Sequence, residues 1–103
     1  MKTMTEQVFV YGTLKFPDVQ REIIGREVPM VSDTLNGFIS EPVVIDGTEY
    51  RALVPLKGAE TEGAIITVTT PELDRIDAYE PDEYKRIKVT TVSGRIVGVY
   101  VKA

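Results

Sequence analysis

Two periodicities in the apolar positions of the chain predict short strands and two helices. Val8–Tyr11 is a continuous apolar run of β-favouring residues, which is typical of a strand buried on both faces. Gly12 ends this run. Near the other end, Arg86–Val92 alternates apolar and polar residues, and the turn Ser93-Gly94 joins it to Arg95–Val101. We therefore expect an early buried strand and a closing hairpin.

The middle of the chain, from Val28 to Val68, has the pattern of strands and turns. Val43–Ile45 and Tyr50–Val54 flank Asp46-Gly47, a pair of residues that strongly favours a two-residue hairpin turn. Ala64–Val68 is a further short β-favouring run. This region therefore predicts a hairpin followed by another strand.

Two segments carry helix signals. Proline is tolerated in the first turn of a helix and aspartate suits its positive end, so Pro17–Ile24 is expected to be a short helix that stops at Gly25. Thr70 fits an N-cap for a second helix over Pro71–Tyr79, which Pro81 would terminate.

These elements amount to six or seven short strands and two short helices. Close spacing and tight turns favour a mixed, mostly antiparallel sheet, and closure into a small β-barrel would remove its edges. The expected class is α+β. At 103 residues the chain is expected to form one domain, residues 1–103.

Composition removes several kinds of chemistry. The chain has no Cys, His or Trp, which excludes a disulfide framework, a thiolate nucleophile and a Ser-His-Asp relay. No Asp-x-Asp-x-Asp-Gly loop supports a calcium site. Acid–base chemistry near neutral pH must therefore use Asp, Glu, Lys, Tyr or groups of the substrate itself.

Charge and hydropathy narrow the partners and the location. The net charge is −4, with 12 basic residues scattered among 16 acidic ones, so we expect no nucleic-acid partner. The longest apolar run, Val8–Tyr11, is far shorter than the ~20 residues that span a bilayer. Met1–Gln7 is polar and unlike a secretory signal. The expected location is the cytoplasm, with no membrane partner; the oligomeric state stays open.

The first candidate site is Tyr11-Gly12-Thr13-Leu14, at the end of the buried strand. Glycine lets the backbone turn sharply and approach a ligand closely, which leaves successive N–H groups able to point at an anion or a carbonyl oxygen. The alternative is that Gly12 simply makes a turn. No second glycine lies nearby, so the segment does not match a phosphate-binding loop.

The second candidate is Glu80. On the predicted helix, Leu73, Ile76 and Glu80 fall on one face, so the carboxylate continues an apolar stripe toward the interior. Loss of hydration there would raise its pKa and suit it to proton transfer near pH 7. The alternative is a solvated helix end, because Pro81 disfavours helical geometry at Glu80 and neighbouring residues are acidic.

Tyr84 and Arg86 follow on one face of the next predicted strand. Tyr84 could orient Glu80 or line a pocket, or it could be ordinary sheet packing. Arg86 could pair with a nearby carboxylate and lower its pKa, which would oppose the role proposed for Glu80. The pattern alone leaves open which carboxylate Arg86 meets.

Taken together, these segments resemble the gamma-glutamylcyclotransferase-like, or AIG2-like, family. The resemblance rests on the segments Val8–Leu14, Glu62–Ala64, Leu73–Glu80, Tyr84–Arg86 and the closing hairpin. It implies a small mixed barrel with flanking helices and a cavity. The order and spacing of these segments extend over nearly the whole chain.

The resemblance also implies an activity. Backbone around the Tyr11–Leu14 turn (Tyr11, Gly12, Thr13 and Leu14) would hold the glutamyl part of a small-molecule gamma-glutamyl substrate, and Glu80 would act as general acid/base in releasing 5-oxoproline. Tyr84 is a further candidate for the pocket wall. Pro81 stands where many members have glycine. The implied reaction requires no metal and no cofactor.

Two other classes of function stay open from the sequence. A binding module of the same fold would recognise a small anionic metabolite or a protein partner without turnover. A structural subunit would pair its strand edges with another chain.

Overall fold

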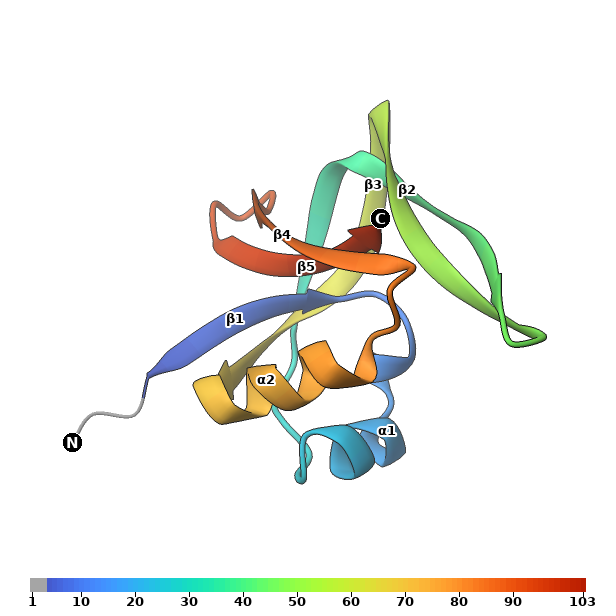
Figure 1. Cartoon of the computed structure of the whole chain (residues 1–103). Helices are drawn as coiled ribbons and strands as arrows, with labels where there is room; N and C mark the ends of the chain where they lie inside the picture. The colour runs from blue at the N-terminus through green and yellow to red at the C-terminus, as the bar shows by residue number, and fades with distance from the viewer. Residues whose placement is uncertain (1–3) are drawn as a thin grey trace.

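The computed structural model describes residues 4–103, which form five strands and two α-helices. The elements, in chain order, are β1 (Thr5–Val10), the short 3-10 helix η1 (Thr13–Lys15), α1 (Pro17–Ile23), β2 (Val31–Ile45), β3 (Thr48–Thr69), α2 (Thr70–Tyr79), β4 (Tyr84–Thr90) and β5 (Ile96–Lys102). Figure 1 shows both α-helices against one side of a curled sheet. The α+β class predicted from the sequence is confirmed.

The sheet has the strand order β2-β3-β1-β5-β4 and mixes both kinds of pairing. β1 is antiparallel to β3 and parallel to β5, while the β2–β3 and β4–β5 pairs are antiparallel hairpins. β3 also reaches β5 directly, where Leu53 pairs with Val101. Because β3 pairs with β1 along one part of its length and with β5 at another, the sheet curls into a half-barrel.

Five strands replace the six or seven expected, because the central runs belong to two long strands. Val43–Ile45 lies within β2, while Tyr50–Val54 and Ala64–Val68 both lie within β3. The predicted Asp46-Gly47 turn is confirmed: φ is 50° at Asp46 and 79° at Gly47, and Ile45 pairs with Thr48.

A large bulge bends the β2–β3 hairpin at mid-length. Phe38 pairs with Pro55 and Asn36 pairs with Glu60, so residues 56–59 lie opposite Gly37 alone. Gly37 and Gly58 have φ values of 83° and 84° there. The outer half of the hairpin therefore leaves the main sheet and curves away, as Figure 1 shows.

Strand β1 lies in the middle of the sheet, and its last three residues, Val8–Val10, are buried on both faces, as predicted. The strand begins at Thr5 and ends at Val10, whereas Val8–Tyr11 was expected. Val8 and Val10 pack into an apolar cluster that includes Ile76 of α2, on the helix side of the sheet. Phe9 points the other way, into a second cluster with Leu53. One short strand thus supplies side chains to two cores.

The predicted boundaries of α1 hold to within one residue, and those of α2 shift by one residue. α1 runs from Pro17 to Ile23, and Gly25 beyond it has φ 96°. The N-cap of α2 is Thr69 rather than Thr70. A Glu three residues after Thr69 completes a capping box, whereas Thr70 lacks that partner.

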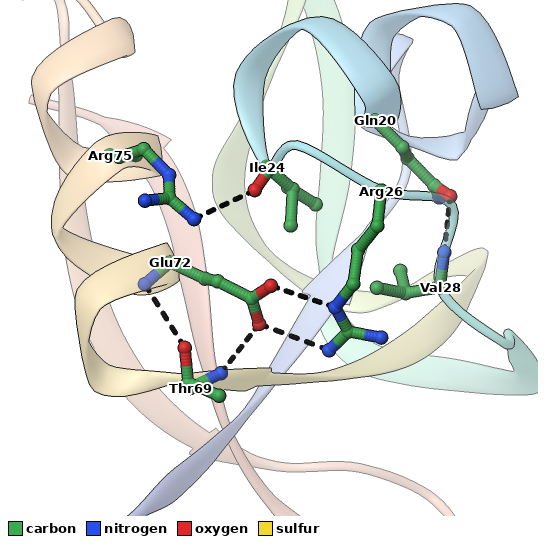
Figure 2. Close-up of polar contacts among 7 residues, drawn as sticks. All are labelled: Gln20, Ile24, Arg26, Val28, Thr69, Glu72 and Arg75. Carbon is green, nitrogen blue, oxygen red and sulfur yellow. Dashed lines mark hydrogen bonds and ion pairs between the residues drawn. The ribbon is translucent and has the colours of Figure 1, made fainter.

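One ion pair and several hydrogen bonds join α2 to the end of α1 and the segment after it (Figure 2). Arg26, just beyond α1, donates from Nε and Nη2 to both oxygens of Glu72 at 2.7 and 3.0 Å. Glu72 also accepts the Thr69 N–H at 2.8 Å, and Arg75 donates to the Ile24 carbonyl at 2.8 Å. The hydrogen bonds from Arg26 lower the pKa of Glu72 to about 2, so one carboxylate caps α2 and anchors the segment after α1.

The closing hairpin is confirmed with small changes of boundary. β4 begins at Tyr84 rather than Arg86, and β5 ends at Lys102 rather than Val101. The polar segment Met1–Gln7 lies partly outside the described residues, which begin at Met4. Within residues 4–103 no helix combines the length and the apolar character required to cross a bilayer.

Gly63 is required by packing. A Cβ added there would lie 2.5 Å from the Val10 carbonyl oxygen and 2.6 Å from Cζ of Phe9. Gly63→Ala is therefore expected to lower the free energy of unfolding by about 1–3 kcal/mol, measured by urea denaturation. The matched control is Gly98→Ala, whose nearest contact would be Cδ of the Arg86 side chain at 3.3 Å rather than a backbone atom at 2.5 Å. Equal losses in the two variants would contradict this assignment.

Candidate functional site

A cavity of about 500 Å³ opens where four parts of the fold meet. Its walls come from the segment after β1, the tip of the β2–β3 hairpin, the C-terminal end of α2 and the start of β4. The volume is in the range of small-molecule sites. The bulge in the hairpin matters here, because it turns the hairpin tip toward the cavity.

All six residues proposed for the site from the sequence line this cavity. They are Tyr11, Gly12, Thr13, Leu14, Glu80 and Tyr84. The first four lie near the start of the chain and the last two near its end, and the sheet brings them together. Their roles toward a ligand remain predictions.

The Tyr11–Leu14 turn lines the cavity and carries two backbone N–H groups that η1 does not use. The first hydrogen bond of η1 runs from the Lys15 N–H to the Gly12 carbonyl, so the Thr13 and Leu14 N–H groups have no acceptor within that helix. A Cβ added at Gly12 would meet no atom within 4 Å. Glycine at this position is therefore not required by packing, in contrast to Gly63.

A buried glutamine fixes the far end of this turn. Gln20 of α1 donates from Nε2 to the Leu14 carbonyl at 2.8 Å, and its Oε1 accepts the Val28 N–H at 3.0 Å. Gln20 is 1% exposed, so these bonds are shielded from water. The turn is thus held by α1 as well as by β1.

The Tyr11 hydroxyl is committed to the fold. It donates to the Tyr100 carbonyl at 2.6 Å and accepts the Leu53 N–H at 3.2 Å. Burial raises the pKa of the Tyr11 phenol well above its ordinary value. Tyr11 therefore positions the turn and is not a proton donor near neutral pH.

Glu80 extends into the cavity from the end of α2. Its backbone is extended (φ −70°, ψ 127°), as favoured before Pro81, while its N–H still bonds to the Ile76 carbonyl. Within residues 4–103 no side chain hydrogen-bonds to the half-buried carboxylate. Burial and the nearby negative charge of Asp77 raise the pKa of Glu80 to about 7.

The carboxylate that meets Arg86 is Asp77. The guanidinium donates from Nε and Nη2 to the two carboxylate oxygens at 3.0 Å each. The Tyr100 hydroxyl adds a third hydrogen bond, to Oδ1 of Asp77 at 2.5 Å. Burial raises the pKa of Asp77, but these hydrogen bonds outweigh it and the pKa is lowered. Arg86 therefore lowers the pKa of Asp77 and not that of Glu80, so it does not oppose proton transfer by Glu80.

Tyr84 lines the cavity and ties its two walls together. Its hydroxyl donates to the Arg51 carbonyl on β3 at 2.9 Å. Burial, followed by the charge of Glu80, raises the pKa of the Tyr84 phenol. Tyr84 is thus a wall residue with its hydroxyl already bonded.

Sequence reasoning missed the hairpin tip and two exposed aromatic residues that complete the cavity. Tyr50 and Arg51 line it from β3, while Phe16 and Tyr79, which are 59% and 41% exposed, lie along it beyond η1 and at the end of α2. The Asp46-Gly47 turn predicted that a hairpin forms, but not that the tip of this hairpin lies against the cavity. In the described part of the chain, no cluster of three or more acidic side chains is placed to hold a metal ion.

Comparison with known proteins identifies a family for this chain. The family described as "Gamma-glutamyl cyclotransferase, AIG2-like" matches residues 8–103. AIG2-like protein A of Arabidopsis thaliana is 38% identical over 86 residues, which are 82% of this chain and 51% of that protein. The chain thus spans about half the length of the curated relatives it matches.

Solved structures share the fold. A solution structure of an Arabidopsis thaliana protein has a TM-score of 0.80 at 31% identity and covers 99% of this chain and 71% of its own. A gamma-glutamyl cyclotransferase structure has a TM-score of 0.77 at 14% identity, covering 97% of this chain and 68% of its own, a likeness in fold. With a family match over residues 8–103, the chain belongs to the gamma-glutamyl cyclotransferase, AIG2-like family.

Proposed function

We propose that this protein is a cyclotransferase that releases 5-oxoproline from a gamma-glutamyl amide or amine. The observation that carries the proposal is one carboxyl, Glu80, with a pKa raised to about 7, facing the same cavity as the backbone donors of the Tyr11–Leu14 turn. A group with that pKa can accept and return a proton at neutral pH. Family membership supports the same reaction class.

In the proposed reaction the substrate supplies its own nucleophile. The α-amine nitrogen attacks the gamma-carbonyl carbon and forms the new C–N bond of a five-membered ring. Glu80 takes the proton that the amine loses and returns it to the leaving nitrogen as the original amide bond breaks. The Thr13 and Leu14 N–H groups would donate to the oxyanion that develops on the carbonyl.

The magnitudes of the separate effects suit so small a site. Intramolecular geometry supplies on the order of 7–11 kcal/mol of a barrier when the substrate is held bent. A positioned acid/base contributes roughly 10²–10⁴-fold, and an aimed oxyanion donor roughly 3–4 kcal/mol. These effects require no imidazole and no thiolate, which the chain lacks.

The direct test is a panel of gamma-glutamyl dipeptides and gamma-glutamyl amines, with 5-oxoproline measured by mass spectrometry. Release of 5-oxoproline from at least one compound supports the proposal. Binding of these compounds without release would instead indicate a binding module of the same fold.

Glu80→Gln is expected to lower the rate of 5-oxoproline release at least a hundredfold while substrate affinity stays within a few-fold, because the amide cannot accept the amine proton. Steady-state kinetics and calorimetric titration measure the two effects. The matched control is Glu83→Gln, which removes an exposed carboxylate nearby that does not line the cavity. Full activity in the Glu80→Gln variant would remove Glu80 from the mechanism.

Gly12→Val is expected to weaken substrate binding and lower the rate about tenfold or more, because the side chain would occupy open space beside the turn. Since a Cβ at position 12 meets no atom within 4 Å, the thermal midpoint should change little. Unchanged affinity in a folded variant would make Gly12 a purely architectural residue.

The raised pKa of Glu80 also predicts a pH dependence of stability. The folded chain holds this proton to about pH 7 and the unfolded chain to about 4.5, so the unfolded state binds fewer protons in this window and stability falls as pH rises. The full shift corresponds to about 3 kcal/mol, and residual exposure of the carboxyl to solvent reduces this value. Glu80→Gln should therefore be more stable than the parent at pH 8, by on the order of 2 kcal/mol, and equal to it at pH 4. Urea unfolding at both pH values measures this, and a constant difference would contradict it.

A further inference from the structure

We infer that Asp77, Arg86 and Tyr100 form a positioning network that holds Glu80 and sets its charge environment, with Asp77 and Arg86 lying outside the larger cavity. The inference rests on the proposed function for its effect on rate. None of the three is assigned a chemical step. The network joins α2, β4 and β5 and lines one small hollow together with Glu80.

Two members of the network, Asp77 and Arg86, lie outside the larger cavity. A second, smaller hollow of about 290 Å³ is lined by Asp77 and Arg86 together with Glu80 and Tyr100. Asp77 and Arg86 do not line the larger cavity, whereas Glu80, Pro81, Tyr84 and Tyr100 line both. Asp77 and Arg86 can therefore act on Glu80 but do not touch a ligand in the larger cavity.

The geometry of the network fixes the end of α2. Asp77 lies three residues before Glu80, about one helical turn, and is held by two bonds from Arg86 at 3.0 Å and one from Tyr100 at 2.5 Å. A carboxylate anchored by a planar fork and a phenol loses most of its freedom. The last turn of α2, and with it the point where Glu80 leaves the helix, is thus clamped to β4 and β5.

Tyr100 connects this clamp to the substrate-binding turn. Its hydroxyl donates to Asp77, while its carbonyl accepts the Tyr11 hydroxyl at 2.6 Å. Tyr100 is 6% exposed. One buried residue therefore contacts both the helix that carries Glu80 and the residue that begins the turn opposite, which sets the distance across the site.

The charges around Glu80 give the network a second effect. The nearby negative charge of Asp77 favours the protonated carboxyl, and Arg86 offsets that charge. Other titratable or charged groups line the two hollows from every element packed against Glu80. They are Tyr79 at the end of α2, Asp82 in the loop, Tyr84 and Lys85 of β4, Tyr100 of β5, Tyr11 before η1, Lys15 at its end, and Asp46, Glu49, Tyr50 and Arg51 at the hairpin tip. Of all these groups, Asp77 is the one whose charge raises the pKa of Glu80.

Two variants test the network because they change the charge in opposite senses. Asp77→Asn removes the negative charge and leaves Arg86 unpaired, so the pKa of Glu80 should fall by about one unit. Arg86→Gln leaves Asp77 uncompensated, so the same pKa should rise above that of the parent protein. Carboxyl carbon NMR titration measures both, with Glu80→Gln used to assign the resonance.

A purely structural role would give a different result. Loosening of the site would expose Glu80 and move its pKa toward 4.5 in both variants. Shifts in the same direction, or no shift, would overturn the inference. Arg86→Lys, which keeps the positive charge, should restore the parent value, and Lys102→Gln, which breaks the exposed β5 ion pair with Glu41, should leave it unchanged.

Tyr100→Phe tests the connecting role without changing any charge. The ring and the carbonyl that accepts from Tyr11 remain, and the bond to Asp77 is lost. We expect kcat to fall about tenfold with KM within twofold, because Glu80 is misplaced while the binding turn is kept. An unchanged kcat would overturn this part of the inference.

The NMR titration requires no substrate, so the two proposals can fail separately. Opposite pKa shifts without 5-oxoproline release from any compound would uphold the network and reject the cyclotransferase. Release of 5-oxoproline without opposite shifts would uphold the enzyme and reject the network.

Discussion

Arg86 has a single fork of donors, and the fold commits that fork to Asp77. Asp77 and Glu80 lie about one helical turn apart at the end of α2. If the Arg86 guanidinium paired with Glu80 instead, it would lower the pKa of Glu80, which could then no longer transfer a proton near pH 7. Because Asp77 takes the ion pair, Glu80 stays half-buried with a pKa of about 7. The chemistry available to the cavity depends on this division between two neighbouring carboxylates.

The sheet, rather than helix α2, determines that Arg86 pairs with Asp77 and leaves Glu80 unpaired among the described residues. β4 carries Arg86 and β5 carries Tyr100, and their antiparallel pairing aligns these two residues directly opposite each other. β5 in turn lies parallel to β1, whose end leads into the Tyr11–Leu14 turn. The acid and the backbone donors are therefore held by adjacent strands of one curled sheet, while the bent β2–β3 hairpin supplies the remaining wall.

Local signals in the sequence predicted most elements well. The Asp46-Gly47 turn, the Pro17 start of α1 and the end of α2 before Pro81 depend on backbone preferences of one or two residues, and all three are confirmed. The strand count was wrong, because the central runs lie within two long strands that continue through the bulge opposite Gly37, where the pattern suggested separate strands. The N-cap of α2 moved to Thr69 because Glu72 completes a capping box there.

The sequence by itself determined which side chains are available: a chain without His or Cys, a glycine after a buried strand, and a glutamate that continues an apolar helical stripe just before a proline. Those features follow from short-range periodicity and backbone preference. Tertiary structure alone decided that Arg86 pairs with Asp77, that Tyr100 links α2 to Tyr11, and that the hairpin tip closes the cavity. Each of these contacts joins residues on different elements. The sequence offers several acids and several acceptors for each donor, and the distances in the curled sheet determine which of them pair.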